Sequence, residues 1–121
     1  MVPTGLNARI QSLAYAWKGI KRMIKTQANA RIHLIISAGA LVLGWFVQLA
    51  ALEWMAIFLA MGLLWMAEAM NTAVELLVDL LIPEQHQQAG QIKDLAAGGV
   101  LFAAFFAAIT GLLIFVPELF F

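Results

Sequence analysis

Four polar side chains interrupt one long apolar stretch of the sequence, at a spacing that could support chemistry. They are three or four residues apart: Glu68, Asn71, Glu75 and Asp79. Because successive residues of a helix are rotated by about 100°, a helix aligns all four on one stripe. A stripe of ionisable residues in a membrane helix is typical of a functional site.

The side-chain types in this stripe fit phosphoryl transfer. An apolar setting makes a carboxylate a better proton acceptor, and Glu68 lies deepest in the apolar stretch. Glu75 and Asp79 are hard oxygen donors of the kind that hold magnesium, usually together with substrate phosphates. Lys93 adds a cation at the same membrane face. Such a set could move a phosphoryl group from a soluble nucleotide to a membrane-embedded alcohol.

The stripe by itself leaves three interpretations open. It could be a catalytic site, an ion pathway through the membrane, or a set of hydrogen bonds between helices, each contributing about 0.6 kcal/mol. The sequence contains no Walker A motif, no protein-kinase glycine loop and no GxGxxG motif, so the usual nucleotide-binding folds are absent.

The composition predicts an integral membrane protein. Of the 121 residues, 64% are hydrophobic and 12% charged, and the mean hydropathy is +0.91. A soluble domain of this size could not bury so much apolar surface. We expect residues 1–121 to form a single domain. The absence of cysteine excludes disulfides, thiol catalysis and cysteine metal sites.

The elements that must position the stripe are predicted to be all α-helical. An amphipathic helix over about 6–27 carries an apolar stripe beside Lys18, Lys21, Arg22 and Lys25, and we expect it to lie in the membrane surface. A targeting peptide and a flexible basic tail are the alternatives. Apolar runs predict three transmembrane helices, over about 34–52, 54–82 and 95–116, the second ending before Pro83.

The basic residues predict the topology. Six of the seven precede the first span, and Lys93 lies between the second and the third. The positive-inside rule therefore places the N-terminus and the 83–93 loop in the cytoplasm. A bundle of three helices can hardly shield a stripe of carboxylates from lipid. Small residues in the third span also favour close packing between subunits, so we expect a homo-oligomer.

The sequence also resembles a known family. The pattern Glu68-x-x-Asn71-Thr72-Ala73-x-Glu75-x-x-Val78-Asp79, followed by His86 and by Lys93-Asp94-Leu95-Ala96-Ala97-Gly98, strongly resembles the prokaryotic integral-membrane diacylglycerol kinases, a family that includes undecaprenol kinases. The resemblance covers nearly the whole chain. It implies a homotrimer in the bacterial inner (cytoplasmic) membrane, with active sites shared between subunits, magnesium-dependent use of ATP, and a lipid alcohol as acceptor.

Roles for individual residues follow from the resemblance. It makes Glu68 the catalytic base, Asn71 an orienting residue, Glu75 a metal ligand and Lys93 the side chain that faces the phosphates. Three further residues resemble nucleotide-side positions: Asp94, His86 and Asp79. Asn29, Arg31 and His33 match a recurring Asn-x-Arg-Ile-His segment, in which we expect His33 to be a capping or interfacial residue.

The chain departs from the family pattern at two positions. Many members have a glutamate where this chain has Gln27, and that glutamate resembles a second metal ligand. A neutral amide is a weaker magnesium donor, so metal binding should depend more on Glu75 and water. Gln85 replaces an aromatic residue of some members, which removes a stacking surface for adenine.

The sequence thus predicts an ATP-dependent lipid kinase. We expect diacylglycerol as acceptor, giving phosphatidic acid, with undecaprenol as the alternative, which the 93–98 run slightly favours. A small ion-conducting or transporter subunit is the competing class of protein.

Overall fold

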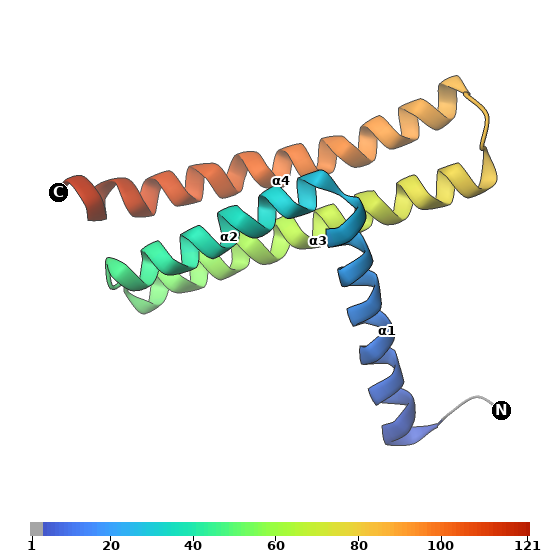
Figure 1. Cartoon of the computed structure of the whole chain (residues 1–121). Coiled ribbons are helices and arrows are strands. Elements are labelled where there is room, and N and C mark those ends of the chain that lie inside the picture. The colour runs from blue at the N-terminus through green and yellow to red at the C-terminus, as the bar shows by residue number, and fades with distance from the viewer. Residues whose placement is uncertain (1–3) are drawn as a thin grey trace.

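A computed structural model describes residues 4–121 of the chain, and this range is helical apart from short connections. The four helices are α1 (Gly5–Thr26), α2 (Ala28–Phe46), α3 (Ala51–Leu81) and α4 (Gln87–Phe120). Helices α2, α3 and α4 lie along a common direction, and α1 leaves them at a steep angle (Figure 1). Each of these three is long and apolar enough to cross a membrane. The predicted all-helical membrane protein with three spans is confirmed.

A single residue separates α1 from α2. Gln27 has an extended backbone, with φ −107° and ψ 116°. Arg31 reaches back across this corner, and its Nη1 donates to the carbonyl oxygens of Ile24 and Lys25, at 3.0 and 2.8 Å. Carbonyls in the last turn of a helix lack intrahelical donors. Arg31 therefore satisfies the end of α1 while it holds the start of α2 against it.

Helix α2 is shifted toward the N-terminus relative to the predicted span of 34–52. It begins at residue 28 because the polar residues before the apolar run are also helical. The start of the apolar run therefore marks a change of polarity and not the start of the helix. It ends at Phe46, before Gln48 adopts a positive φ of 57°. The Leu49 N–H then donates to the Gly44 carbonyl at 3.1 Å, which closes the turn.

Helix α3 begins at residue 51 rather than 54 because Glu53 belongs to its first turn. The Glu53 carboxylate accepts a hydrogen bond from the Ala50 N–H at 3.0 Å and so satisfies a free donor at the helix start. The helix ends at Leu81, one residue before the predicted end and two before Pro83. Its 31 residues span about 46 Å, longer than the hydrocarbon core of about 30 Å.

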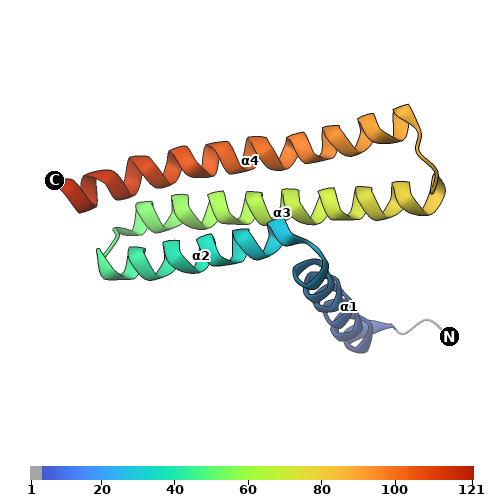
Figure 2. The ribbon, with the colours of Figure 1, turned by 45° about the horizontal axis from the view of Figure 1, so that its top comes forward.

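Helix α4 is longer at both ends than the predicted span of 95–116. It begins at Gln87, so the polar connection to α3 is only residues 82–86. At the other end the helix continues through Pro117 to Phe120. Membrane helices tolerate a proline where neighbouring groups satisfy the backbone, and this one lies in the last turn. The connection and both flanking helix ends project together at one end of the bundle (Figure 2).

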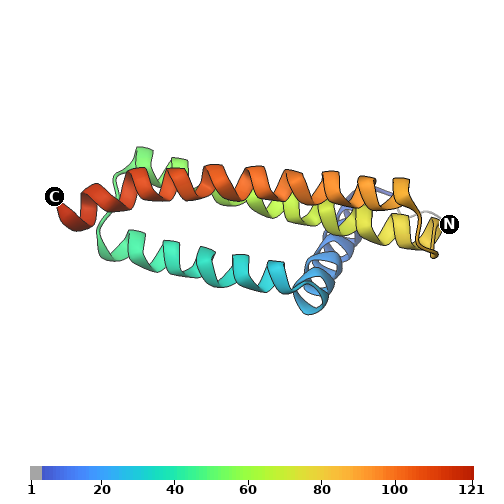
Figure 3. The same ribbon diagram turned by 90° about the horizontal axis from the view of Figure 1, so that it is seen from above.

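Helix α3 is the centre of the packing. Its most extensive contact is with α4, and it also packs against α2 and α1. Figure 3 shows α4 running along α3 while α2 stands further from α4. An apolar cavity of about 360 Å³ lies between these three helices. The buried apolar side chains are few, namely Met23, Ala30, Leu49, Ile57, Leu64, Val78, Ala89 and Val100. Most large apolar side chains therefore face outward, as expected for a surface that contacts lipid or other subunits.

Gly44 is the position where a side chain would disturb the α2–α3 turn most directly. A Cβ there would lie 2.8 Å from Trp54 Cη2 and 2.9 Å from Leu49 Cδ1. We expect Gly44→Ala to destabilise the protein by about 1–3 kcal/mol, the usual cost of overpacking. Thermal unfolding in detergent measures the change. Gly39→Ala on the same helix is the control, because a Cβ there meets nothing within 4 Å. Equal stability of the two variants would contradict the role assigned to Gly44.

Candidate functional site

The polar stripe predicted from the sequence lies on α3 and becomes progressively more exposed toward its end. Glu68 is 1% exposed and Asn71 6%. Glu75 is half-buried, and the Asp79 side chain is 63% exposed. The predicted order, from a buried glutamate to exposed carboxylates, is therefore present within one chain. One helix presents carboxylates to an apolar interior and to water.

Glu68 meets α2 through His33. Glu68 Oε2 lies 3.6 Å from His33 Nε2, and the His33 side chain is only 12% exposed. Neither Glu68 oxygen has a hydrogen-bond partner within residues 4–121, and the same is true of His33 Nε2 and Asn71 Oδ1. The Thr72 hydroxyl donates its hydrogen bond to the Glu68 backbone carbonyl, at 2.9 Å. The buried end of the stripe thus contains polar atoms without partners, which are costly unless a substrate or ion completes them.

His33 does not cap α2, which was one of its two predicted roles. Gln27 is the residue that precedes α2, and His33 lies inside the helix against Glu68. The two spans run in opposite directions, so the beginning of α2 and the later part of α3 lie at the same depth. The predicted topology therefore indicates that His33 and Glu68 share a depth, but not that their two helix faces meet.

A second contact between the spans was also missed. Trp65 Nε1 donates to the Ser37 hydroxyl at 3.1 Å, in a partly buried position. Ser37 is one turn beyond His33 on α2, and Trp65 is nearly one turn before Glu68 on α3. The hydrogen bond therefore fixes how the two helices are aligned along their axes next to the buried glutamate.

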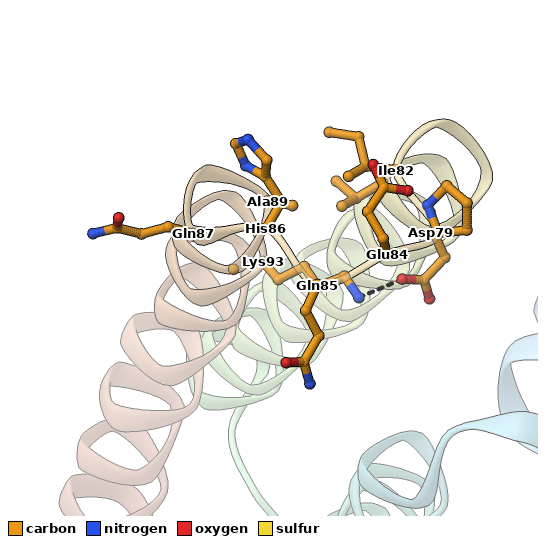
Figure 4. A pocket seen from close by; sticks show the side chains of 11 residues that line it. Asp79, Ile82, Glu84, Gln85, His86, Gln87, Ala89 and Lys93 are labelled. Carbon is orange, nitrogen blue, oxygen red and sulfur yellow. Dashed lines mark hydrogen bonds and ion pairs between the residues drawn. The ribbon is translucent and has the colours of Figure 1, made fainter.

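The exposed end of the stripe borders a cavity of about 500 Å³. The end of α3, the connection and the first turns of α4 line it (Figure 4). Lys93 of α4 forms an ion pair with Asp79 of α3 across this cavity. Their side chains are 36% and 63% exposed, so water and soluble ligands can reach both.

His86 and Asp94 both resemble nucleotide-side positions, but only His86 lies at this cavity. His86 lines the cavity, but it also caps α4, because its Nδ1 accepts a hydrogen bond from the Gln88 N–H at 3.1 Å. Figure 4 shows the His86 ring turned away from the pair formed by Asp79 and Lys93. Asp94 is exposed on α4 and is not among the cavity-lining residues.

The two residues expected around a metal, Gln27 and Glu75, do not contact each other through a hydrogen bond. Gln27 and Glu75 are both half-buried, and within the described range no hydrogen bond joins them. Nor does any group of three or more histidine, cysteine or acidic side chains gather there into a metal site. Magnesium commonly takes only one or two carboxylates and completes its shell with water and substrate phosphates. Glu75, one turn from the unpaired Asn71 Oδ1, offers oxygen donors that fit such an ion.

Asn29 and Arg31 do not join the stripe. Asn29 is exposed, and the Arg31 guanidinium is engaged at the corner between α1 and α2. The structure thus brings together two pairs, His33 with Glu68 and Asp79 with Lys93. Eleven residues of helix, about 16 Å, separate Glu68 from Asp79. The two pairs form distinct ends of one polar stripe.

The chain is thus an all-helical bundle with three candidate spans, whose long central helix carries a buried acid at one depth and an exposed ion pair at its end. The model of the prokaryotic diacylglycerol kinase family matches residues 14–115. The chain belongs to this family, as the resemblance in its motif predicted.

Individual relatives carry two different names. An undecaprenol kinase of Bacillus subtilis is 40% identical over 114 residues, covering 94% of this chain and 93% of that protein. A diacylglycerol kinase of Synechocystis is 35% identical over 109 residues, covering 89% and 62%. The diacylglycerol kinase of Escherichia coli K12 is 28% identical over 107 residues, covering 88% of each chain. The protein is thus a membrane-bound lipid kinase by family, which disfavours the ion-conducting alternative.

Proposed function

We propose that this protein transfers the γ-phosphate of ATP to the hydroxyl group of a membrane lipid, with undecaprenol as the first candidate acceptor and diacylglycerol as the second. The observation that carries the proposal is the buried carboxylate of Glu68, which has no hydrogen-bond partner within residues 4–121, in a chain of a lipid-kinase family. Such a group is suited to take a proton from an acceptor that is itself embedded in the membrane.

The order of the two acceptors rests on similarity. The sequence alone predicts diacylglycerol as the acceptor. The undecaprenol kinase, however, is 40% identical and aligns over 94% of this chain and 93% of its own length. The Escherichia coli diacylglycerol kinase is 28% identical. The two names still describe one chemistry, phosphorylation of a lipid alcohol.

Each end of the stripe has its own task in this proposal. Glu68 accepts the hydroxyl proton, and Asn71, one turn away, orients the reacting groups. Lys93 binds the phosphates, for which it must leave Asp79. An ion pair this exposed contributes about 0–1 kcal/mol at most, so a polyphosphate can replace the carboxylate at little cost. Asp94 and His86 remain nucleotide-side residues in the proposal, although His86 also caps α4.

Magnesium, when bound, neutralises charge on the phosphates during transfer. Glu75 is the carboxylate proposed to hold it, because it is half-buried between the two ends of the stripe. Gln27 lies at the corner between α1 and α2 and contributes at most a neutral donor. Water and the phosphates supply the other ligands.

The assembly and orientation complete the proposal. A Cβ at Gly98 or Gly99 of α4 would meet nothing within 4 Å, so these small residues are free to pack against another copy. We therefore propose the homotrimer implied by the family resemblance. The α1 helix exposes Leu6, Ile10 and Leu13, which suits a position in the membrane surface. The basic residues place the N-terminus and the 82–86 connection in the cytoplasm.

Lipid phosphorylation by the purified protein tests the proposal. With labelled ATP and magnesium, we expect label to enter undecaprenol faster than diacylglycerol when each is supplied in mixed micelles. Micelles without added acceptor provide the blank. Product from diacylglycerol alone would reverse the order of acceptors, and no labelled lipid from either would refute a lipid kinase.

Glu68→Gln tests the proposed base. The amide keeps the shape of the side chain but cannot take a proton, so kcat should fall by about 10²–10⁴-fold, the usual contribution of general base catalysis. Nucleotide binding should persist, since Glu68 is far from the exposed end. Glu53→Gln, at the other end of α3, is the control, because an amide oxygen can still accept from the Ala50 N–H. Near-normal kcat in Glu68→Gln would remove Glu68 from this role.

Gln27→Glu tests the proposed metal shell. A carboxylate is a stronger magnesium donor than an amide, so half-maximal activity should be reached at a lower magnesium concentration. Titration of activity against magnesium at fixed ATP provides the measurement. Gln91→Glu, which adds the same charge on exposed α4, should leave the titration unchanged. An unchanged titration in Gln27→Glu as well would place residue 27 outside the metal shell.

A further inference from the structure

The contact between His33 and Glu68 has no role in the function as described so far. The two residues lie on different spans and are 35 positions apart in the sequence. The His33 side chain is 12% exposed and the Glu68 side chain 1%. His33 Nε2 and Glu68 Oε2 are 3.6 Å apart, which is slightly longer than a hydrogen bond. A shift of a few tenths of an ångström would form one.

Glu68 needs a donor, and His33 is placed to be it. Neither carboxylate oxygen has a hydrogen-bond partner within residues 4–121, and His33 Nε2 also lacks one. A buried carboxylate without hydrogen bonds is strongly disfavoured, so these atoms should satisfy one another. A neutral imidazole that carries its proton on Nε2 supplies the donor.

The surrounding contacts hold the imidazole in place. Toward the start of α2, Arg31 fixes the helix to the last turn of α1 through two carbonyl oxygens. One turn beyond His33, Ser37 accepts the hydrogen bond from Trp65 of α3. The imidazole therefore lies between two fixed points on its own helix, and the contact at Ser37 also sets the alignment of α3.

We propose that His33 is a positioning residue for Glu68. Its Nε2–H donates to Oε2 and fixes the plane of the carboxylate, which leaves Oε1 to take the proton of the acceptor hydroxyl. This inference rests on the proposed function, because a base needs orientation only if it acts as one. His33 affects the reaction only through Glu68, so it is not itself a catalytic residue.

The bond changes in the transfer step do not involve His33 directly. Glu68 Oε1 takes the hydroxyl proton, and the acceptor oxygen forms a bond to the γ-phosphorus. The bond from that phosphorus to the bridging oxygen breaks, and its electron pair leaves on ADP. Holding the carboxylate in line with the hydroxyl raises the rate because misplacement by about 1 Å can cost 10²-fold.

Steady-state kinetics of three variants test this role. His33→Leu removes the donor and keeps an apolar side chain of moderate size, and it should lower kcat by roughly 10²-fold with little change in KM for ATP. His33→Gln restores an N–H donor on a side chain of similar reach, and it should recover a large part of the loss. Ile35→Leu, on the same helix at a position that is 73% exposed, should retain kcat and serves as the control.

Infrared spectroscopy tests the contact without relying on turnover. The difference between wild type and Glu68→Gln isolates the carboxyl band of Glu68. His33→Leu should shift this band, and Ile35→Leu should not. A shifted band in a protein that phosphorylates no lipid would support the contact and refute only the proposed kinase function.

Several outcomes would overturn the inference while the kinase function stands. One is wild-type kcat in His33→Leu, and another is a His33→Gln variant no more active than His33→Leu. Equal loss of kcat in Ile35→Leu would show that the loss does not depend on the imidazole and would reduce His33 to a packing residue. An unshifted Glu68 band in His33→Leu would remove the hydrogen bond itself.

Discussion

A polar side chain inside a bilayer must find its partner within the protein, because lipid offers no hydrogen bonds. This constraint determines how Glu68 is placed. Its carboxylate is 1% exposed and faces His33 of another span, so the contact between α2 and α3 encloses the most polar part of the interior. The hydrogen bond from Trp65 to Ser37 aligns the same two helices one turn away. Arg31, at the beginning of α2, holds the helix from the other side.

The same constraint explains why the protein needs so little conventional core. Only a small set of apolar side chains is buried among residues 4–121, since leucine and phenylalanine on the outside of the bundle are as well solvated by lipid as by protein. What must be buried is polar: Ser37, Glu68, Asn71 and Thr72. The specific packing of the bundle therefore coincides with its candidate site, and substitutions that loosen the α2–α3 contact should affect both.

The number of spans and the carboxylate stripe could be read from the sequence because each rests on a one-dimensional signal. Apolar run length predicts a span, and helical spacing predicts which side chains of one helix align. Helix ends were less well predicted, since polarity marks the edge of the bilayer and not the end of a helix. Glu53, whose carboxylate satisfies a donor at the start of α3, lies just outside the predicted span of 54–82 for that reason. The partner of Glu68 depends on how two helices face each other, and no pattern within either helix encodes that relation.

The length of α3 has a mechanical consequence. The helix is continuous from Ala51 to Leu81, and eleven residues of it hold Glu68 and Asp79 about 16 Å apart along a stiff rod. Thinning or thickening of the surrounding membrane can tilt this rod, but it cannot bring its two ends closer. In the proposed function, a membrane lipid binds at one end of this fixed distance and a nucleotide at the other, so their reacting groups can meet only if the two substrates together span it.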